Sequence, residues 1–271
     1  MIVLLALGPT SHLGCRPDQR HSGRVSRVPD ERPVTTALSS AADTEGVAIR
    51  RFQNGGGTGY AEKRSRMVET QIRARGIKDA RVLAAMEKVP RHVFVGEGFR
   101  DNAYMDGPLP IGHGQTISQP YIVALMTELT RPRAGARALD VGTGSGYQAA
   151  VLAELVSQVY SIEILCPLAA EAEARLSRLG YRNIEVRCGD GYRGWPEHAP
   201  FDVIIVAAAP DHIPQPLVDQ LAPGGKMVLP VGDAYQDLLV IEKDPDGTVH
   251  RRSAGAVLFV PMTGEAERKG R

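Results

Sequence analysis

A glycine-rich turn that follows an acidic residue is the feature that most constrains this 271-residue chain. Residues 138–147 read ALDVGTGSGY, so an apolar run ends in Asp140 and then breaks into alternating glycines. A helix-compatible segment follows directly over residues 148–155. This order predicts a strand, a tight turn and a helix N-terminus, the arrangement in which backbone N–H groups approach a ligand closely.

The spacing within the turn distinguishes between ligands. A dinucleotide fingerprint would need its third glycine at the position of Tyr147. Asp140 would also add negative charge beside a pyrophosphate, whereas it suits a ligand with a positive end. S-adenosylmethionine carries both an ammonium and a sulfonium group. The pattern therefore favours a site for this cofactor at Asp140, Gly142, Gly144 and Gly146, over the alternative of a glycine-rich turn that binds nothing.

Two acids farther along the chain extend this site. The apolar run 159–164 predicts the next strand, which ends near Glu163, about 20 residues beyond the glycine turn. A carboxylate there is placed to accept both hydroxyl protons of a ribose; the alternative is an ordinary strand-end carboxylate in solvent. After a third run, Asp190 stands where an acid can accept a hydrogen bond from an exocyclic amine such as that of adenine.

Apolar runs and helical patterns alternate from residue 136 onward, which predicts an α/β fold. The segment 202–208 is apolar on both faces, as in a central parallel strand that helices cover on both sides. Near the end of the chain two closely spaced runs flank a turn at 244–247, which indicates an antiparallel end to a mostly parallel, twisted sheet. In such a sheet the ligand lies at the carboxyl ends of the strands. The predicted strands are 137–141, 159–164, 184–188, 202–208, 226–231, 238–243 and 257–260.

The start of the chain differs from the rest. Residues 16–59 are rich in Gly, Ser, Pro and Arg and have no sustained period, so residues 1–59 are predicted to be a disordered extension. The domain is expected over residues 60–264, with helices in 60–90 that cover one edge of the sheet. Residues 265–271 are expected to form a tail.

The first 15 residues leave two interpretations open. A short apolar start leads to Cys15 and resembles a lipoprotein signal, but it has no basic residue and its apolar run is short. We expect a cytoplasmic protein, with export or lipid anchoring through this segment as the alternative. The sequence has no stretch of about 20 apolar residues, so no transmembrane helix is predicted.

Composition argues against several function classes. The formal net charge is +1 and aromatic residues make up 5% of the chain, so nothing favours nucleic acid or a membrane as partner. The three cysteines form no C-x-x-C pair, and their odd number argues against a disulfide framework and a zinc site. No metal is expected, and Cys188 is predicted to pack as a small apolar residue near a strand end.

A long irregular segment precedes the sheet. Glycines and prolines punctuate residues 91–120, and long loops of this kind in compact domains are commonly functional. Within it, residues 112–120 read GHGQTISQP, which closely resembles the signature of the protein-L-isoaspartate O-methyltransferase family. The resemblance runs from about Met67 to Thr263, and it includes the motifs at 91–95, 142–146, 189–191, 200–202, 207–210, 221–225 and 259–263.

The resemblance implies a Rossmann-like class I methyltransferase fold and a repair enzyme. Such an enzyme moves a methyl group from S-adenosylmethionine to the free α-carboxylate of an L-isoaspartyl residue in a damaged protein. The methyl ester then leaves as a succinimide forms, and hydrolysis restores some normal aspartate. We expect a monomer with isoaspartyl proteins and peptides as partners. The sequence leaves two alternatives: a methyltransferase with a different acceptor, and a nucleotide-binding scaffold without catalysis.

The family motif also implies roles for single residues. Ser118 matches the active-site position, and Thr116 and Ile117 would border both substrate and cofactor. At the other end of the site Asp190 with Gly191 would bind the adenine, and position 163 the ribose. Leu258 departs from the family, because bacterial members often carry a basic residue there, and this bears on how the substrate backbone is gripped.

The expected chemistry needs few catalytic groups. A carboxylate acceptor with a pKa of about 4 is already ionised at neutral pH, so no general base is required and no Ser-His-Asp or Cys-His set is expected. The Ser118 hydroxyl would hydrogen-bond one carboxylate oxygen and aim the other at the methyl group. The alternative is that Ser118 caps a helix that begins near Pro120. His113 is expected to order the loop, with a substrate contact as the alternative.

Overall fold

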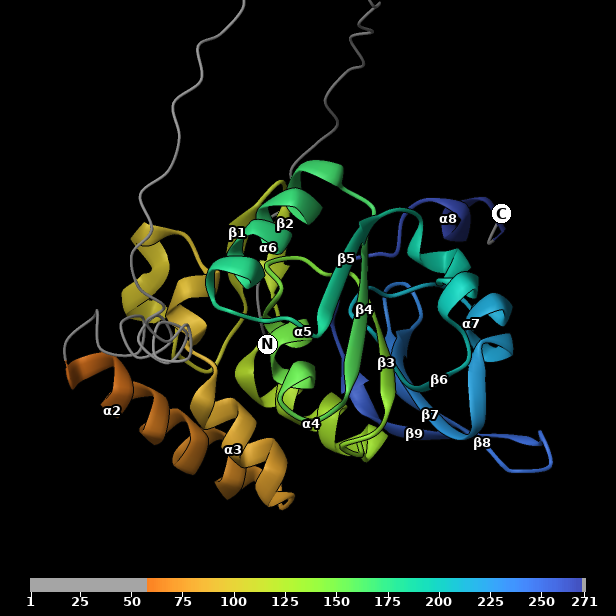
Figure 1. Cartoon of the computed structure of the whole chain (residues 1–271), viewed down its shortest axis with the longest axis horizontal. Helices are drawn as coiled ribbons and strands as arrows, with labels where there is room; N and C mark the ends of the chain where they lie inside the picture. Colours follow the sequence, from red (N-terminus) through yellow and green to blue (C-terminus); the bar gives the residue numbers. More distant parts are fainter. Residues whose placement is uncertain (1–57, 270–271) are drawn as a thin grey trace, which may run out of the picture. The chain divides into compact units, whose positions relative to one another are not determined.

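The computed structural model describes residues 58–269, and its central feature is a seven-stranded β-sheet (Figure 1). The first five strands in spatial order pair in parallel with one another, and the last two are added antiparallel at one end. This confirms the predicted mostly parallel sheet with an antiparallel end. In spatial order the strands are β5 (Ile184–Cys188), β4 (Gln158–Glu163), β3 (Arg137–Val141), β6 (Phe201–Val206), β7 (Leu221–Val231), β8 (Gln236–Lys243) and β9 (Val249–Val257).

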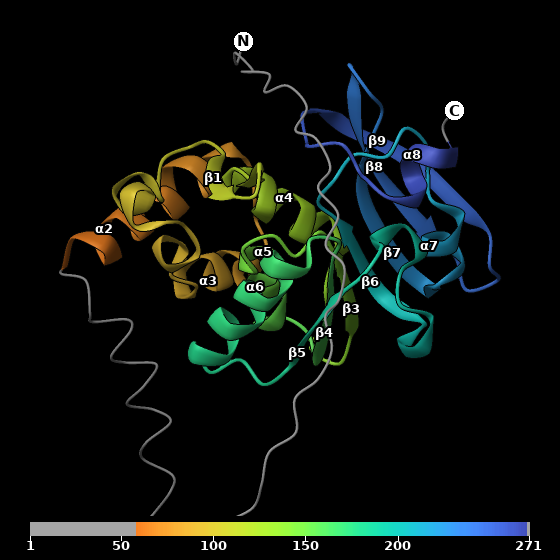
Figure 2. The same ribbon diagram turned by 90° about the horizontal axis from the view of Figure 1, so that it is seen from above.

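Helices cover both faces of the sheet, as predicted (Figure 2). Alternate residues of β6 serve two cores: Val203 and Ile205 pack under the first helical layer, whereas Ile204 packs under the second. The first layer is α4 (Pro120–Thr130), α5 (Tyr147–Ala153) and α6 (Cys166–Arg178). The second is α7 (Gln215–Asp219) and α8 (Glu265–Lys269), and the 3-10 turns η5 (Gly191–Arg193) and η6 (Pro196–His198) connect β5 to β6.

The N-terminal helices form a further layer outside α4 and α5 (Figure 2). They are α2 (Thr58–Met67), the π-helical turn η1 (Val68–Ile72), the 3-10 turn η2 (Arg73–Arg75) and α3 (Ala80–Lys88). The α3 helix begins at the cap Asp79, whose carboxylate accepts a hydrogen bond from Arg81 N–H (2.9 Å), and buries Leu83 and Met86. The prediction that these helices cover a sheet edge is wrong, because α4 and α5 lie between them and the sheet.

Residues 91–120 contain regular structure that the sequence does not predict. Two 3-10 segments, η3 (Arg91–Phe94) and η4 (Glu97–Asn102), precede an antiparallel pair, β1 (Leu109–Gly112) and β2 (Gln115–Ile117). The turn between the two strands holds His113 at a positive φ of 52°. The pair escapes recognition because its strands have four and three residues and the first contains Pro110.

The last strand also differs from its prediction. The sequence indicates a strand over 257–260, whereas β9 begins at Val249 and ends at Val257. It is the edge strand of the sheet, and most of its side chains, including Arg251 and Arg252, are exposed. Such an edge has no apolar run to detect. Residues 258–260 instead leave the sheet, and the carbonyl of Val260 accepts a hydrogen bond from the backbone of Ala209 (2.8 Å).

The cysteine prediction is wrong as well. Cys166 and Cys188 form a disulfide with their Cα atoms 4.9 Å apart, and Cys188 is exposed rather than packed. The topology brings them together, because Glu163 lies opposite Cys188 in the parallel pair β4–β5 and Cys166 follows Glu163 closely in the chain. An odd count cannot reveal such a pair; the third cysteine, Cys15, lies outside the described residues.

Within residues 58–269 no helix is long and apolar enough to cross a membrane. In the same range, no group of three or more His, Cys, Asp or Glu residues could hold a metal ion. The predicted extension and its signal-like start lie outside the described residues, apart from the last two positions, which belong to α2. Part of the predicted tail forms α8, where Ala266 is buried in the core under α7.

Candidate active site

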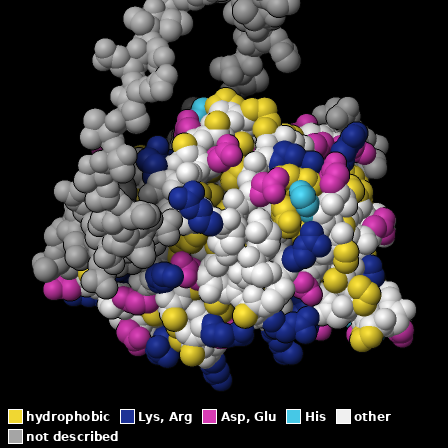
Figure 3. Space-filling model, viewed as in Figure 1, with side chains coloured by type: hydrophobic (Ala, Val, Ile, Leu, Met, Phe, Trp, Pro, Cys, Tyr) yellow, Lys and Arg dark blue, Asp and Glu magenta, His cyan; other side chains and the backbone are white. Residues whose placement is uncertain are grey.

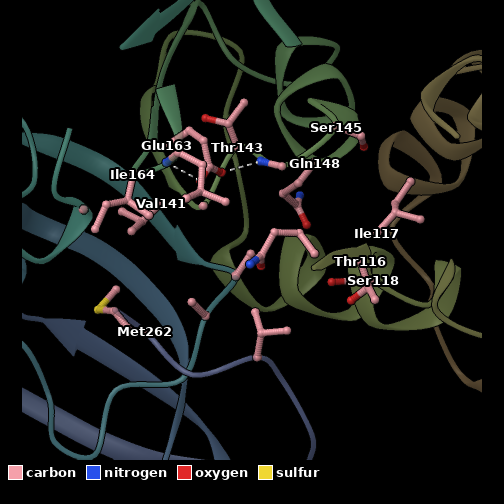
Figure 4. Close-up of a pocket in the computed structure, with 18 of the residues that line it drawn as sticks. Thr116, Ile117, Ser118, Val141, Thr143, Ser145, Gln148, Glu163, Ile164 and Met262 are labelled. Carbon is pink, nitrogen blue, oxygen red and sulfur yellow. Dashed lines mark hydrogen bonds between the residues drawn. The ribbon is translucent and has the colours of Figure 1, made fainter. Parts of the chain in front are cut away.

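A cavity of about 230 Å³ opens at the carboxyl ends of β3, β4 and β6 (Figure 4). This is the edge of a parallel sheet at which ligands bind. Its walls are the turn after β3, the end of β4, the loop around β2 and the residues that follow β9. Of the residues predicted for the site, Thr116, Ile117, Ser118, Gly142, Gly144, Glu163 and Gly191 line the cavity, whereas Asp140, Gly146 and Asp190 do not.

The glycine turn is bonded to the end of β4. The Gly142 N–H donates to the carbonyl of Ile162 (2.8 Å), and the Gly144 N–H donates to Oε2 of Glu163 (2.8 Å). Gly146, at a positive φ of 88°, is the N-cap of α5. Because the backbone is left-handed there, a side chain would be strained. The turn therefore holds the α5 N-terminus beside the cavity, although Gly146 itself stays behind the wall.

Glu163 lies at the end of β4 and presents its carboxylate at the cavity (Figure 4). The residue is only 5% exposed. Its Oε2 accepts from Gly144 N–H and its Oε1 accepts from Leu165 N–H (3.0 Å), so the carboxylate is held in one orientation. Each oxygen keeps a further lone pair, and two fixed acceptors side by side suit the paired hydroxyls of a ribose.

Asp140 is placed differently from its prediction, which had it face the positive end of a ligand directly. Its side chain is fully buried behind the turn, Oδ2 accepts from the Ser161 hydroxyl (2.7 Å), and Oδ1 has no partner among the described residues. Burial raises the pKa of the Asp140 carboxyl to about 7, and the nearby Glu163 carboxylate adds to the rise. The Asp140 side chain therefore does not reach the cavity, from which the turn separates it.

Asp190 is also engaged elsewhere. Its Oδ1 accepts from Tyr192 N–H (3.0 Å) and its Oδ2 from Glu265 N–H (2.8 Å), so the carboxylate ties η5 to the start of α8. The structure does not bring this acid to the cavity wall. Gly191 does reach the wall, and a Cβ added there would lie 2.5 Å from Cγ1 of Val141, so only glycine fits.

The opposite wall is the loop that carries Ser118. Figure 4 shows Thr116, Ile117 and Ser118 together, across the cavity from Glu163. Ser118 is half-buried and directly precedes Gln119, the N-cap of α4. Among the residues that the structure describes, no side-chain hydrogen bond caps this helix, so the capping alternative for Ser118 has no contact to support it.

His113 lies at the rim of the same wall. It occupies the turn between β1 and β2, and its Nε2 is 3.4 Å from Oε1 of Glu171 on α6. This contact links the loop to the helix layer, as the loop-ordering interpretation expects. Since His113 also lines the cavity, a substrate contact stays open as the alternative.

Several lining residues were not predicted. Tyr147 and Gln148 follow the glycine turn directly, and Ala208 lies at the carboxyl end of a predicted strand, so the switch-point rule could have identified all three. Tyr147 is backed by Arg91, which is fully buried with its guanidinium 4.9 Å from the ring centre. Met262 comes from the segment after β9; it belongs to the family motif at 259–263, but no local pattern shows that the fold returns it to the site.

The residues present fit S-adenosylmethionine. The left-handed glycine turn exposes backbone at the wall, Gly191 brings its backbone to the wall in close contact with Val141, and Glu163 offers fixed acceptors. The buried Asp140 oxygen, which has no hydrogen-bond partner within residues 58–269, would place negative charge behind the turn that a cationic ligand stabilises. Ser118 lines the same cavity from the wall opposite Glu163.

Comparisons with known proteins agree with this reading. A family model described as Protein-L-isoaspartate(D-aspartate) O-methyltransferase (PCMT) matches residues 62–267. A protein-L-isoaspartate O-methyltransferase from a Synechococcus strain is 58% identical over 211 residues, covering 75% of this chain and 86% of that protein. Another from Gloeobacter violaceus is 55% identical over 201 residues, covering 73% and 98%.

Solved structures show the same fold. A protein-L-isoaspartate O-methyltransferase structure has a TM-score of 0.69 at 28% identity and covers 76% of this chain and 69% of that chain. A Plasmodium falciparum structure described as an enzyme of this kind, in complex with S-adenosyl-L-homocysteine, has a TM-score of 0.63 at 28% identity. It covers 74% of this chain and 98% of that chain. The fold is therefore that of a Rossmann-like class I methyltransferase, as predicted.

Proposed function

The chain belongs to the protein-L-isoaspartate O-methyltransferase family, and on that premise we propose how its cavity carries out the reaction. The enzyme uses S-adenosylmethionine to methylate the free carboxylate of L-isoaspartyl residues in damaged proteins. The alternative of an unrelated acceptor loses its support, because relatives of this identity share one name. The roles of single residues below are proposals.

Glu163 is the ribose ligand in this proposal. Its carboxylate is buried at the cavity wall, held by two backbone donors, and has free lone pairs for both hydroxyls. The backbone of Gly191, which lines the cavity and packs tightly against Val141, borders the adenine in this proposal, and the backbone of Gly142 and Gly144 faces the methionine end. Asp190 is proposed to act through η5, whose first turn it caps, rather than by touching the base.

Ser118 is the residue that positions the acceptor. The isoaspartyl carboxylate is ionised at neutral pH, so it needs orientation rather than a base. The hydroxyl would donate a hydrogen bond to one carboxylate oxygen and leave the other free to attack the methyl group of S-adenosylmethionine; the methyl–sulfur bond would break, with S-adenosylhomocysteine as the leaving group. Orientation and exclusion of water can contribute about 7–11 kcal/mol to such a reaction. Thr116 and Ile117 border the meeting point of the two ligands.

Asp140 contributes charge without contact. With a pKa of about 7 it is poised between two protonation states, and a cation in the cavity favours the ionised one. Its hydrogen bond from Ser161, which in turn bonds the Thr143 hydroxyl (2.6 Å), connects it to a residue of the wall. The same group that is costly to bury in the free protein thus assists binding of a positive ligand.

Partners and location are proposed at a coarser level. The described face in Figure 3 intersperses basic and acidic side chains, which fits protein substrates better than a polyanion. We propose a monomer, which size-exclusion chromatography with light scattering tests.

We also propose a cytoplasmic location. The disulfide argues for export instead, since structural disulfides persist mainly in oxidising compartments. Fractionation of native cells decides between a cytoplasmic and an exported protein.

The placement of Ser118 and Glu163 on opposite walls of one cavity carries the proposal. The test uses S-adenosylmethionine with a labelled methyl group and two peptides that differ only in Asp versus L-isoAsp at one position. Transfer to the isoAsp peptide alone is expected. Transfer to neither peptide, with cofactor bound, would mean another acceptor, and no cofactor binding would mean that the cavity is not the site.

A further inference from the structure

A disulfide links two chain segments that form one end of the cavity. Cys166 is the first residue of α6 and Cys188 is the last residue of β5, and both are exposed. Neither lines the cavity, and the proposed reaction uses neither. Each is close in the chain to a residue that does, because Leu165 precedes Cys166 and Gly191 follows shortly after Cys188.

The Cys166 end of the link holds the turn that follows Glu163. Leu165 N–H donates to Oε1 of Glu163 (3.0 Å), and both Ile164 and Leu165 line the cavity. Ile164 is 37% exposed, so packing restrains this turn weakly. The disulfide directly after this turn adds a covalent restraint to the two backbone hydrogen bonds that orient the Glu163 carboxylate.

The Cys188 end holds the second segment against the first. Gly189 N–H donates to the backbone carbonyl of Glu163 (2.9 Å), and Gly191 then passes so close to Val141 that no side chain fits. The link therefore joins two segments whose hydrogen bonds both meet at Glu163. A shift of either one changes the width of the cavity at its proposed adenosine end.

We propose that the Cys166–Cys188 disulfide positions the adenosine end of the cofactor site, and that reducing it to two thiols weakens cofactor binding. The inference rests on the proposed assignment of Glu163 and Gly191 to that end. Its cause is conformational entropy. The link removes freedom from the two segments before the ligand arrives, so less freedom is lost on binding. When the disulfide is reduced to two thiols, the ligand itself must order the two segments.

The exposed sulfurs make the link accessible to a dithiol reductant. A thiolate of the reductant attacks one cysteine sulfur, the S–S bond breaks, and a mixed disulfide forms while the other cysteine leaves as a thiolate and takes up a proton. The second thiol of the reductant then displaces the remaining cysteine. The protein gains two electrons and two protons, and the reductant becomes a disulfide. Cys166 is the better leaving group, because the N-terminal amides of the 13-residue α6 stabilise a thiolate.

The test uses full-length protein with Cys15→Ser, which retains only the pair in question. Calorimetry gives the Kd for S-adenosylhomocysteine in the oxidised form and after reduction with dithiothreitol, and thiol counting verifies each state. We expect the Kd to rise about tenfold on reduction. The KM for S-adenosylmethionine should rise with it, while kcat at saturation stays within about twofold. Equal Kd values in the two states would overturn the proposal, as would a pair that stays reduced under oxidant.

The matched control is Cys15→Ser with Cys166→Ser and Cys188→Ser. Its Kd should equal that of the reduced pair and should not respond to dithiothreitol; a response would overturn the proposal. Glu163→Gln in the oxidised background separates this inference from the assignment beneath it. Weaker binding in Glu163→Gln with no effect of reduction removes the disulfide's role and leaves the ribose assignment. Normal binding in Glu163→Gln, together with weaker binding on reduction of the disulfide, supports the disulfide's role and removes the ribose assignment of Glu163.

The midpoint potential of the Cys166–Cys188 pair gives a second readout. A ligand would not shift this potential if the disulfide only stabilised the fold in general. If the oxidised form binds S-adenosylhomocysteine about tenfold more tightly, saturating ligand lowers the midpoint potential of the pair by about 30 mV. An equilibrium titration against a dithiol buffer, with and without ligand, measures this shift. A potential that ligand leaves unchanged would contradict the proposal even if reduction lowers the melting temperature.

Discussion

The end of β4 and the loop that carries Ser118 face each other across one cavity, yet they are held in different ways. On the β4 side, Glu163 is 5% exposed and its carboxylate is held by two backbone N–H groups. On the other side, Ser118 is half-buried in a segment between a short strand pair and α4, with no capping bond. The first wall is part of the sheet itself, whereas the second is attached to it.

This difference indicates which wall determines cofactor binding and which determines selectivity for the acceptor. A wall made from the ends of parallel strands is fixed by the hydrogen bonds of the sheet, and it suits a cofactor that never changes. A wall made from a loop can change its side chains without disturbing the core. We therefore expect changes in the strand-end wall to alter cofactor affinity and changes in the loop to alter turnover.

The largest expected effect is on the strand-end wall. Glu163→Ala removes an acceptor with charge and frees two backbone donors, so we expect the binding free energy of S-adenosylmethionine to weaken by about 1.5–3 kcal/mol, or roughly tenfold or more in Kd. Calorimetry measures it. Glu173→Ala on the exposed side of α6 is the matched control and should bind normally. An unchanged Kd in Glu163→Ala would remove Glu163 from the site.

The next effect is on the loop. Ser118→Ala should lose about 1.4 kcal/mol or more of transition-state stabilisation, about tenfold in turnover of an isoaspartyl peptide, with cofactor affinity and melting temperature near wild type. The exposed Ser177→Ala is the control. A variant that melts several degrees lower but turns over normally at low temperature would make Ser118 a structural residue.

A smaller effect concerns pH and tests the charge behind the turn. In the free protein, protonated Asp140 contributes stability that is fully present below its ordinary pKa of 3.8 and is lost as the pH rises through about 7. A cationic ligand favours the ionised form instead, so affinity for S-adenosylmethionine should fall about fivefold between pH 7 and pH 6.

Two comparisons check this interpretation. Binding of S-adenosylmethionine near pH 7 should release protons, which calorimetry in buffers of different ionisation enthalpy detects. S-adenosylhomocysteine lacks the sulfonium charge and should show a weaker dependence. The same pH profile in Asp140→Asn as in wild type would assign the titration to another group.

The smallest expected effect is from the N-terminus. Deleting residues 1–57 leaves α2 intact from Thr58, and we expect the melting temperature and kcat to change little. Differential scanning calorimetry and the peptide assay measure both. A large fall in either would mean that the deleted residues pack on the domain and support one of the two walls.

The two walls also differ in how well the sequence predicts them. The strand-end wall follows from local patterns, since an apolar run that ends in Asp140 and alternating glycines dictates a strand, a turn and a helix. Even so, the pattern could not tell that Asp140 is buried or that Asp190 binds α8, because both depend on packing between distant segments. Gly191 does line the cavity, and Val141 leaves space there for no other residue, but its predicted contact with adenine stays a prediction.

The loop wall follows from the family resemblance rather than from physical pattern. The strands β1 and β2 are too short to show a period, and Met262 reaches the cavity only because the chain folds back after β9. The sequence does not predict the Cys166–Cys188 disulfide for a similar reason. It depends on the register between β4 and β5, which no count of cysteines contains.

The double variant Ser118→Ala with Glu163→Ala tests the separation of the two walls most directly. Calorimetry with S-adenosylhomocysteine and kcat at saturating S-adenosylmethionine are measured for the double variant and both single variants. We predict that the double variant binds like Glu163→Ala and turns over like Ser118→Ala, each within about 0.5 kcal/mol. If Ser118→Ala alone weakens cofactor binding as much as Glu163→Ala does, the two walls do not act separately and the account is wrong.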